Sequence, residues 1–206
     1  MYIPDVYKIE DEEKIVSFIE NNSFADLVTF HNESMCSNKV PFYFDKEERV
    51  LYGHFGRSNP QLVDIEESGD VLVIFSGPQS YVSPHWYESI NGVPTWNYQT
   101  LQIRGRATLV DDNSLIKILE NLSRFHEANF LSPWSMSEVE DDKLKHMLNM
   151  ITGFKIDIDD INFKEKMSQN RSLSDQQSVI NSLNEWGTKE SISVARIMGD
   201  NINVNS

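Results

Sequence analysis

The sequence predicts an α+β domain built on an antiparallel sheet or barrel. Strand-like segments come in clusters interrupted by helices, a pattern that differs from the regular βαβ alternation of parallel sheets. The long segment Thr95–Val110 alternates apolar and polar residues with the period of two that is typical of a half-buried strand. The chain has 206 residues, 39% of them hydrophobic and 11% aromatic, which is enough for one domain with a real core and a small appendage.

The first half of the chain predicts one helix followed by strands. The helix Glu10–Asn22 places Ile15, Phe18 and Ile19 on one face and acidic residues elsewhere. Asn59-Pro60 indicates a second, short helix that ends near Gly69, with the asparagine as cap. A hairpin through Lys46-Glu47-Glu48 is expected between the second and third of the predicted strands, which are Ala25–His31, Lys39–Asp45, Val50–Phe55 and Val71–Phe75.

The second half predicts further helices around a returning strand. Asp111–Ala128 carries an apolar stripe, and Ser137-x-x-Glu140 reads as a capping box that opens the next helix. From Gly153 the alternation of a strand returns, with a turn expected at Asp159-Asp160. The remaining signals are a helix start at Ser172-x-x-Asp175 and helix stops at Gly187 and Gly199, followed by a polar tail from Asp200.

Charge and composition exclude several classes of protein. Eighteen basic residues against thirty-two acidic ones give a net charge of −14, which disfavours nonspecific nucleic-acid binding and binding to an anionic membrane. The single cysteine, Cys36, allows neither an intrachain disulfide nor a Cys-rich metal site. The longest apolar run, Val71–Phe75, is too short to span a bilayer, and the start of the chain has no signal-peptide pattern, so we expect a cytoplasmic protein.

Most catalytic signatures are missing. The sequence contains no phosphate-binding loop of the G-x-x-x-x-G-K-[ST] type, no G-x-G-x-x-G and no G-x-S-x-G. The five histidines have spacings that indicate no metal site. Any chemistry is therefore expected to come from a bound group.

One region, Gly77–Arg106, differs from the rest of this acidic chain. It contains a single acid, Glu88, two arginines, and a concentration of tyrosine and tryptophan. It fits either an aromatic-rich loop over the core or a site for a flat ligand, with rigid apolar walls and hydrogen-bonding side chains.

Two further clusters place cations beside hydroxyl and amide side chains at strand ends. These are Gly53–Pro60, with Arg57 just before the predicted short helix, and Phe163–Arg171. Cations, hydroxyls and free N–H groups are what a phosphate needs, although ordinary capping and solvated charge explain either cluster alone. With the aromatic region, they indicate a phosphorylated planar cofactor.

These blocks, in this order, resemble the PaiB family of FMN-binding negative transcriptional regulators. The matching blocks are Met1-Tyr2-Ile3-Pro4, Gly53-His54-x-x-Arg57-x-Asn59-Pro60, Gly77-Pro78-x-x-Tyr81-Val82-Ser83-Pro84-x-Trp86-Tyr87, Val93-Pro94-Thr95-Trp96-Asn97-Tyr98 and Lys166-x-Ser168-Gln169-Asn170-Arg171. The resemblance extends from residue 1 to about residue 198. It implies a split β-barrel over residues 1–171, a helical extension over 172–199, a frayed tail over 200–206, and a homodimer with FMN at the subunit interface.

The resemblance also implies a set of FMN-binding residues. His54, Arg57 and Asn59 are expected at the phosphate end, and Lys166, Ser168, Gln169 and Arg171 at the closing edge of the pocket. The residues expected to line the flavin ring are Tyr81, Ser83, Thr95, Trp96, Asn97 and Gln102. One departure stands at Asn38-Lys39-Val40-Pro41, where the family usually has Thr-His-x-Pro, so a histidine-dependent role there is in doubt.

Three functions remain open. The first is a flavin-binding regulator that acts through the flavin or a partner protein, because segment 172–199 has too few basic residues for a DNA-recognition helix. The second is a flavin-dependent oxidoreductase that uses NAD(P)H on a small molecule. The third is a barrel without flavin or with another planar group such as haem, for which His54, His85 and His126 are the candidate ligands, although each fits a surface or hydrogen-bonded histidine better.

Overall fold

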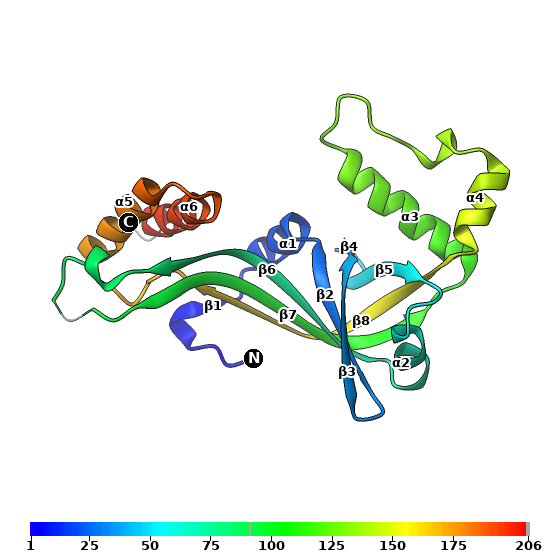
Figure 1. Cartoon of the computed structure of the whole chain (residues 1–206), viewed down its shortest axis with the longest axis horizontal. Helices are drawn as coiled ribbons and strands as arrows, with labels where there is room; N and C mark the ends of the chain where they lie inside the picture. The colour runs from blue at the N-terminus through cyan, green and yellow to red at the C-terminus, as the bar shows by residue number, and fades with distance from the viewer. Residues whose placement is uncertain (91, 205–206) are drawn as a thin grey trace. The chain divides into compact units, whose positions relative to one another are not determined.

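A computed structural model describes residues 1–90 and 92–204 of the chain (Figure 1). Its strands form an antiparallel sheet with the order β3-β2-β6-β7-β8-β5-β4, and β1 pairs with β8. The chain divides into two compact units, which are described one at a time. Unit 1 comprises Met1–Ile15, Ser76–Leu101 and Asn162–Ser206, and unit 2 comprises Val16–Phe75 and Gln102–Ile161. The α+β antiparallel class predicted from the sequence is confirmed.

Unit 2 contains most of the shorter strands. The helix α1 (Glu12–Asn21) leads to the hairpin of β2 (Phe24–His31) and β3 (Ser34–Pro41), and β2 also pairs with β6 (Asp70–Val82). The predicted hairpin around Lys46-Glu47-Glu48 is present, because β4 (Tyr43–Asp45) pairs with β5 (Val50–Gly56). The short helix α2 (Gln61–Glu67) packs near β2.

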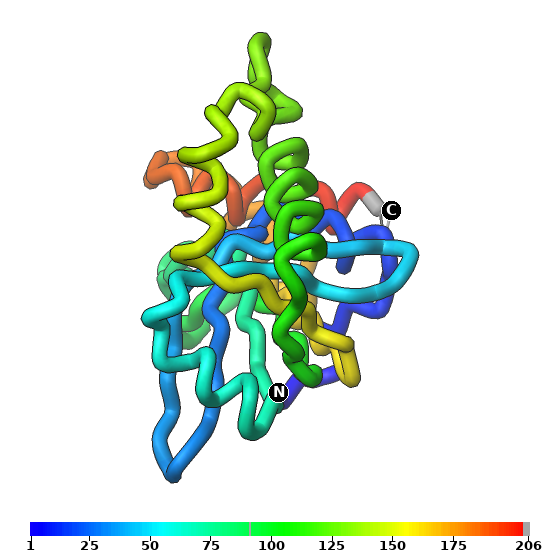
Figure 2. Tube along the Cα trace, turned by 90° about the vertical axis from the view of Figure 1, so that its right-hand side faces the viewer, coloured from blue at the N-terminus to red at the C-terminus, as the bar shows by residue number. Residues whose placement is uncertain are grey.

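The rest of unit 2 comes from the second half of the chain. It includes the later part of β7 (Thr95–Leu109), α3 (Asp112–Glu127), the 3₁₀ turn η3 (Met136–Glu138), α4 (Asp141–Leu148) and the start of β8 (Ile151–Lys166). Figures 1 and 2 both show α3 and α4 as a helical connection that joins the end of β7 to the start of β8. The β5 strand pairs with β8 from Val50↔Asp157 to Gly56↔Ile151.

Aromatic rings fill the core of unit 2. Phe154 is fully buried and lies 5.1 Å from the ring of Phe55 and 6.2 Å from that of Phe42, between ring centroids. Gly53 faces Phe154 so closely that a Cβ there would lie 2.7 Å from the phenyl ring, so the absent side chain makes room for this packing. At Gly105 a Cβ would lie 2.2 Å from the Asp157 carbonyl oxygen, which only a glycine permits.

Unit 1 has its own core beneath two helices. α5 (Leu173–Trp186) and α6 (Lys189–Val204) pack side by side, and α5 also contacts the 3₁₀ turn η2 (Pro84–Trp86). The 3₁₀ turn η1 (Asp5–Tyr7) precedes the two-residue strand β1 (Lys8–Ile9). The buried residues of the core come from the end of β6, the residues that follow η2 and β8, and both helices: Val82, Tyr87, Met167, Val179, Ile180, Leu183, Val194, Ala195 and Met198.

The prediction of a turn at Asp159-Asp160 is wrong, because β8 continues through both residues. The Asp160 carboxylate lies 2.8 Å from the Arg104 guanidinium, and this ion pair keeps the acidic side chain on a strand. The prediction that Ser137-x-x-Glu140 opens a helix is also wrong. Ser135 and Glu138 form the capping box instead, around η3, and α4 begins after Glu140 without a side-chain cap. Both pairs have the same spacing, so the pattern alone did not distinguish them.

The end of the chain differs from the sequence prediction. Gly187 ends α5 in a left-handed conformation, with φ of 72°, as predicted. The predicted helix stop at Gly199 is wrong, because α6 continues to Val204. Residues 200–204 of the predicted frayed tail are therefore helical. Residues 205–206 of the predicted tail lie outside the described part of the chain. The amide of Asn201 donates to the buried Glu165 carboxylate at 2.8 Å, a contact that holds the last turn of the helix.

Candidate functional site

The expected cofactor-binding residues divide between the two units. Unit 2 contains His54, Arg57, Asn59 and Gln102. Unit 1 contains the larger group: Tyr81, Ser83, Thr95, Trp96, Asn97, Lys166, Ser168, Gln169 and Arg171.

Arg57 of unit 2 is occupied by contacts with its own unit. Its Nε donates to the Ile151 carbonyl at 2.9 Å, and its guanidinium lies 3.4 Å from the Asp112 carboxylate at the start of α3. Half of the side chain is exposed. The arginine therefore joins the end of β5 to β8 and α3, whatever else it binds.

Asn59 and His54 have different local roles. Pro60 is the N-cap position of α2, one residue after the predicted asparagine, and the Asn59 side-chain oxygen accepts from the N–H of Gln61, the first helical residue, at 3.0 Å. His54 is half-buried on β5, and its Nδ1 is buried without a hydrogen-bond partner. Burial lowers the pKa of His54, because it disfavours the charged form of the imidazole. Gln102 is half-buried on β7.

The departure at Lys39 has a local explanation. Its ammonium pairs with the Asp26 carboxylate of the neighbouring strand at 2.7 Å, directly across the ladder. Next to it, the buried Gln61 receives a hydrogen bond from Asn38 at 2.9 Å and donates to the Leu27 carbonyl at 3.0 Å. These polar side chains satisfy one another, and their role is to hold α2 on the β2–β3 hairpin.

In unit 1, Lys166 is tied to the beginning of β7. Its ammonium donates to the Thr95 hydroxyl and, at 2.8 Å, to the Trp96 carbonyl. Burial, and then repulsion from Lys164 and Arg171, lower the pKa of Lys166. An anion placed here would relieve that repulsion.

Asn97 and Ser168 form a closed pair. Asn97 is fully buried, and its amide donates to the Ser168 hydroxyl at 3.0 Å, while the hydroxyl donates back to the amide oxygen at 3.1 Å. Ser168 takes a left-handed backbone, with φ of 63°, and Gln169 bridges the Met167 N–H and the Glu165 carbonyl. These hydrogen bonds shape the turn after β8.

Tyr81 and Trp96 are the exposed aromatic residues of the expected site. Their rings meet edge to face, with centroids 6.0 Å apart, and 37% of Tyr81 and 54% of Trp96 are exposed. Ser83 caps η2 by accepting from the His85 N–H at 3.3 Å. The pair offers an open apolar surface beside Lys166, which is bonded to the Trp96 carbonyl.

Arg171 lies over a tyrosine that was absent from the expected set. Its guanidinium carbon is 4.5 Å from the ring centroid of Tyr87, which is 8% exposed. Lys164 lies 5.4 Å from the ring of Tyr98. The spacing of Lys164 and Lys166 on one strand already puts both on the same face, which is the sequence signal that could have identified Lys164.

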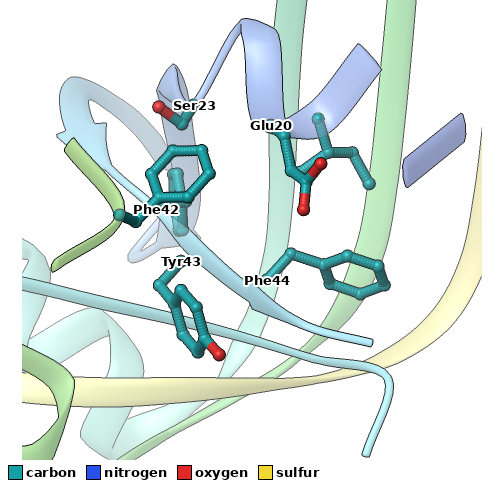
Figure 3. A pocket seen from close by; sticks show the side chains of 7 residues that line it. Glu20, Ser23, Phe42, Tyr43 and Phe44 are labelled. Atoms are coloured by element: carbon teal, nitrogen blue, oxygen red, sulfur yellow. The ribbon is translucent and has the colours of Figure 1, made fainter. Parts of the chain in front are cut away.

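Two hollows lie elsewhere, in unit 2. One, of about 10 Å³, is lined by residues of α1 and α3 and by Phe42, Tyr43 and Phe44, which lie in β4 or just before it (Figure 3). It has room for about one water molecule and is a packing gap of the core. The other, of about 420 Å³, lies between α3 and the segment 133–137, and its lining includes Arg124 and Trp134. The expected cofactor-binding residues line neither hollow.

Residues 1–160 match the family described as "Putative FMN-binding domain". The chain belongs to this FMN-binding family. It is 34% identical over 204 residues, covering 98% of each chain, to the protease synthase and sporulation protein PAI 2 of Bacillus subtilis, a PaiB-family protein. It is also 30% identical over 201 residues to an uncharacterized protein of Emericella nidulans, covering 79% of this chain and 80% of that one. The predicted PaiB membership is confirmed.

Solved structures confirm the split-barrel fold. The FAD and heme binding protein of Mycobacterium smegmatis has a TM-score of 0.61 at 12% identity, covering 84% of this chain and 79% of that one. A protein described as a 5-nitroimidazole antibiotic resistance protein of Bacteroides thetaiotaomicron has a TM-score of 0.58 at 17% identity, covering 76% and 85%. These identities support a common fold for the FMN-binding family and such proteins, and nothing more specific.

The side chains of unit 1 fit FMN, the cofactor of this family. Lys166 and Arg171 would provide positive charge for a phosphate or for ring carbonyls, and Trp96 and Tyr81 would provide an aromatic surface. In residues 1–90 and 92–204, no group of three or more His, Cys, Asp or Glu side chains is arranged to hold a metal ion. Over the same residues, no helix is long and apolar enough to cross a membrane.

Proposed function

We propose that this protein is an FMN-responsive regulator, which acts through its bound flavin or a partner protein and not through extensive DNA contact. The observation that carries the proposal is the grouping in unit 1 of Lys166, Arg171 and the exposed aromatic pair Tyr81 and Trp96. In a chain with a net charge of −14, cations gathered beside exposed rings are the feature that a flavin phosphate requires.

Trp96 and Tyr81 would stack against the flavin ring, and Lys166 would donate a hydrogen bond to it. Lys166 is suited to this because its bonds to Thr95 and to the Trp96 carbonyl fix its position. When bound, FMN would supply redox chemistry, and the chain itself would supply binding and orientation.

The charges of the C-terminal helices support the absence of direct DNA contact. α5 carries Asp175 and Glu185 and no basic residue, and α6 carries Lys189 and Arg196 against Glu190 and Asp200. A recognition helix requires a basic face for the phosphate backbone. The B. subtilis relative is named as a protease synthase and sporulation protein, and this name supports a regulatory role.

Flavin titration tests the cofactor part of the proposal. We expect the fluorescence of FMN to be quenched when it binds to the wild-type chain. Trp96→Ala should weaken binding about tenfold or more, because a stacking surface is lost. Trp186→Ala is the matched control, since Trp186 is 52% exposed and Trp96 54%, and it should bind FMN normally. A wild-type chain that does not bind FMN would contradict the proposal.

A second experiment tests the mode of regulation. In a gel-shift assay at moderate salt, with and without FMN, we expect no sequence-specific complex on promoter DNA. A specific complex at nanomolar protein would show direct DNA binding. We also propose a homodimer with the flavin at its interface, for which light scattering of the purified chain should give twice the 23.8 kDa mass.

The alternative is a flavin-dependent oxidoreductase. It is favoured by the exposure of the Trp96 and Tyr81 surface, because a flavin stacked on one face there would leave its other face open to a second substrate. The solved relative described as the flavocytochrome Anf3 of Azotobacter vinelandii, with a TM-score of 0.58, is at 15% identity evidence for fold only. Bleaching of the 450 nm flavin band on addition of NADH or NADPH would support this function, and its absence with both would exclude it.

A further inference from the structure

The helical connection between β7 and β8 exposes several large apolar side chains. Residues 123–150, which all belong to the described part of the chain, include no buried residue. The exposed large apolar residues of this stretch are Phe130, Leu131, Trp134, Met147 and Met150. Apolar side chains that gather on one exposed segment indicate a surface for interaction with another molecule.

The helix α4 of this connection is amphipathic and has no buried face in the described chain. Its residues Leu144, Met147 and Leu148 have the spacing of one helix face. Met147 is 50% exposed, and the two leucines are only half-buried. A helix of eight residues gains most of its stability from packing of its apolar face, so a molecule that covers this face would stabilise α4.

The larger of the two hollows lies in the same connection, between α3 and the segment 133–137. It has a volume of about 420 Å³. Its apolar lining residues are Ala128, Pro133, Trp134 and Met136. The Trp134 N–H donates to the Glu127 carboxylate at 2.9 Å, and Ser135 forms a capping box with Glu138, so hydrogen bonds hold the wall in place. A preformed apolar hollow can take a large side chain of a partner at little cost in ordering.

The charge around the hollow is negative. Its charged lining residues are Glu120, Arg124 and Glu127 of α3, so the two carboxylates flank the arginine one helical turn away on either side. The whole segment 111–150 has eight acidic and four basic residues. The surface therefore attracts a positively charged molecule.

This charge also narrows the class of occupant. Nucleic acid and an anionic membrane are repelled by it, and a second copy of the same surface would bring like charges together. A small molecule would fill the hollow and leave Phe130 and Leu131, which do not line it, exposed. The occupant that satisfies both the charge and the apolar residues is a cationic protein segment.

We propose that the hollow, together with Phe130, Leu131 and Trp134, is a docking surface for a basic, amphipathic segment of a partner protein. An apolar side chain of the partner would enter the hollow against Trp134, and its lysines or arginines would pair with Glu120 and Glu127. The inference rests on the partner-protein part of the proposed function, for which it names the surface and the chemistry of the partner.

The probe for this surface is a fluorescein-labelled amphipathic peptide of leucine and lysine, with its leucines at helical spacing. A second peptide has glutamate in place of lysine, and fluorescence anisotropy measures the binding of both. Trp134→Ala and Leu131→Ser remove apolar contacts, and Glu120→Gln removes a charge from the hollow. The matched controls, at exposed positions that do not line the hollow, are Trp186→Ala, Leu173→Ser and Glu66→Gln.

We expect the wild-type chain to bind the lysine peptide more tightly than the glutamate peptide, with an affinity that falls as the salt concentration rises. Trp134→Ala should weaken binding about tenfold or more, and Leu131→Ser about threefold. Glu120→Gln should weaken it about twofold and reduce its salt dependence. The three control variants should bind like the wild type. Because Leu131 is fully exposed, Leu131→Ser tests the surface even if Trp134→Ala lowers the Tm.

FMN titration of the same proteins separates this inference from the proposed function. If the wild type binds FMN and the three variants bind the lysine peptide as it does, the docking surface is wrong and the flavin part of the proposed function stands. If the wild type binds no FMN and the variants lose peptide affinity as expected, the docking surface stands and regulation through FMN is refuted.

Three further results would overturn the docking surface. Equal binding of the two peptides would show that positive charge is not selected. Equal losses in the variants and their controls would show an unspecific attraction to an acidic chain. Light scattering that gives a dimer for the wild type and a monomer for Leu131→Ser would show that a second copy of the chain covers this surface.

Discussion

The blocks around Arg57 in unit 2 and around Lys166 in unit 1 contain the same kinds of residue and differ in what those residues contact. Arg57 and Asn59 are occupied by a carbonyl, a carboxylate and a helix start. Lys164 and Arg171 contact aromatic rings and, in the described chain, no carboxylate. A cation with its local partners present gains less from a phosphate than one without them. The comparison therefore favours unit 1 as the source of binding energy for an anionic cofactor.

The largest expected effect compares the two blocks directly. Lys166→Gln should weaken FMN binding about ten- to a hundredfold, because it removes a half-buried, positioned ammonium. Arg57→Gln should weaken it by about threefold at most, since its guanidinium already has partners. Fluorescence titration of both variants measures the difference, and a greater loss with Arg57→Gln would contradict the assignment of most FMN-binding energy to unit 1.

Substitutions at the starts of α2 and α5 compare the two units by the stability that each helix start contributes. Asn59→Ala removes the side-chain oxygen that accepts from the first N–H of α2. Ser172→Ala removes the cap of α5, where the Ser172 hydroxyl accepts from the Asp175 N–H at 3.1 Å. Each should lower the free energy of unfolding by about 1 kcal/mol. Urea denaturation measures this loss of stability, and in a separate FMN titration Asn59→Ala should leave the affinity unchanged. A loss of affinity without a loss of stability would mean that Asn59 binds the cofactor.

The two glycines of the C-terminal helices should respond in opposite directions. A Cβ at Gly199 meets nothing within 4 Å, so Gly199→Ala should raise the free energy of unfolding by about 0.5–1 kcal/mol. Gly187 has φ of 72°, so Gly187→Ala should lower it by about 1 kcal/mol. Urea denaturation distinguishes them. Destabilisation by Gly199→Ala would show that α6 ends before Val204 in solution.

The smallest effect concerns His54 and pH. Burial lowers its pKa in the folded chain below the ordinary value of 6.5, so as the pH falls the unfolded chain takes up the proton first. The free energy of unfolding should therefore decrease as the pH falls through about 6.5, until the folded-state pKa is passed. His54→Gln should flatten this dependence, whereas the exposed His146→Gln should not. An unchanged slope in His54→Gln would exclude His54 as its source.

Periodicity and motif blocks in the amino-acid sequence were sufficient to predict the fold class, the position of most elements and the family. Periodicity carries this information, because an alternating run such as Thr95–Val110 buries all its apolar side chains on one face only when it forms a β-strand. Local chemistry was readable for the same reason: the Asn59 hydrogen bond at the start of α2 and the left-handed Gly187 depend on neighbours a few residues away. The motif blocks were sufficient for the FMN-binding family.

Contacts between distant segments determine which polar residues already have partners. The Asp160 carboxylate on β8 pairs with Arg104, distant in sequence, and α6 continues past Gly199, where Asn201 donates to the buried Glu165. In the same way, Asn97 is closed off by Ser168, whereas Tyr87 keeps a hydroxyl without a partner. Such contacts depend on strand register and on packing between segments far apart in the chain, and a linear pattern of residue types does not encode them.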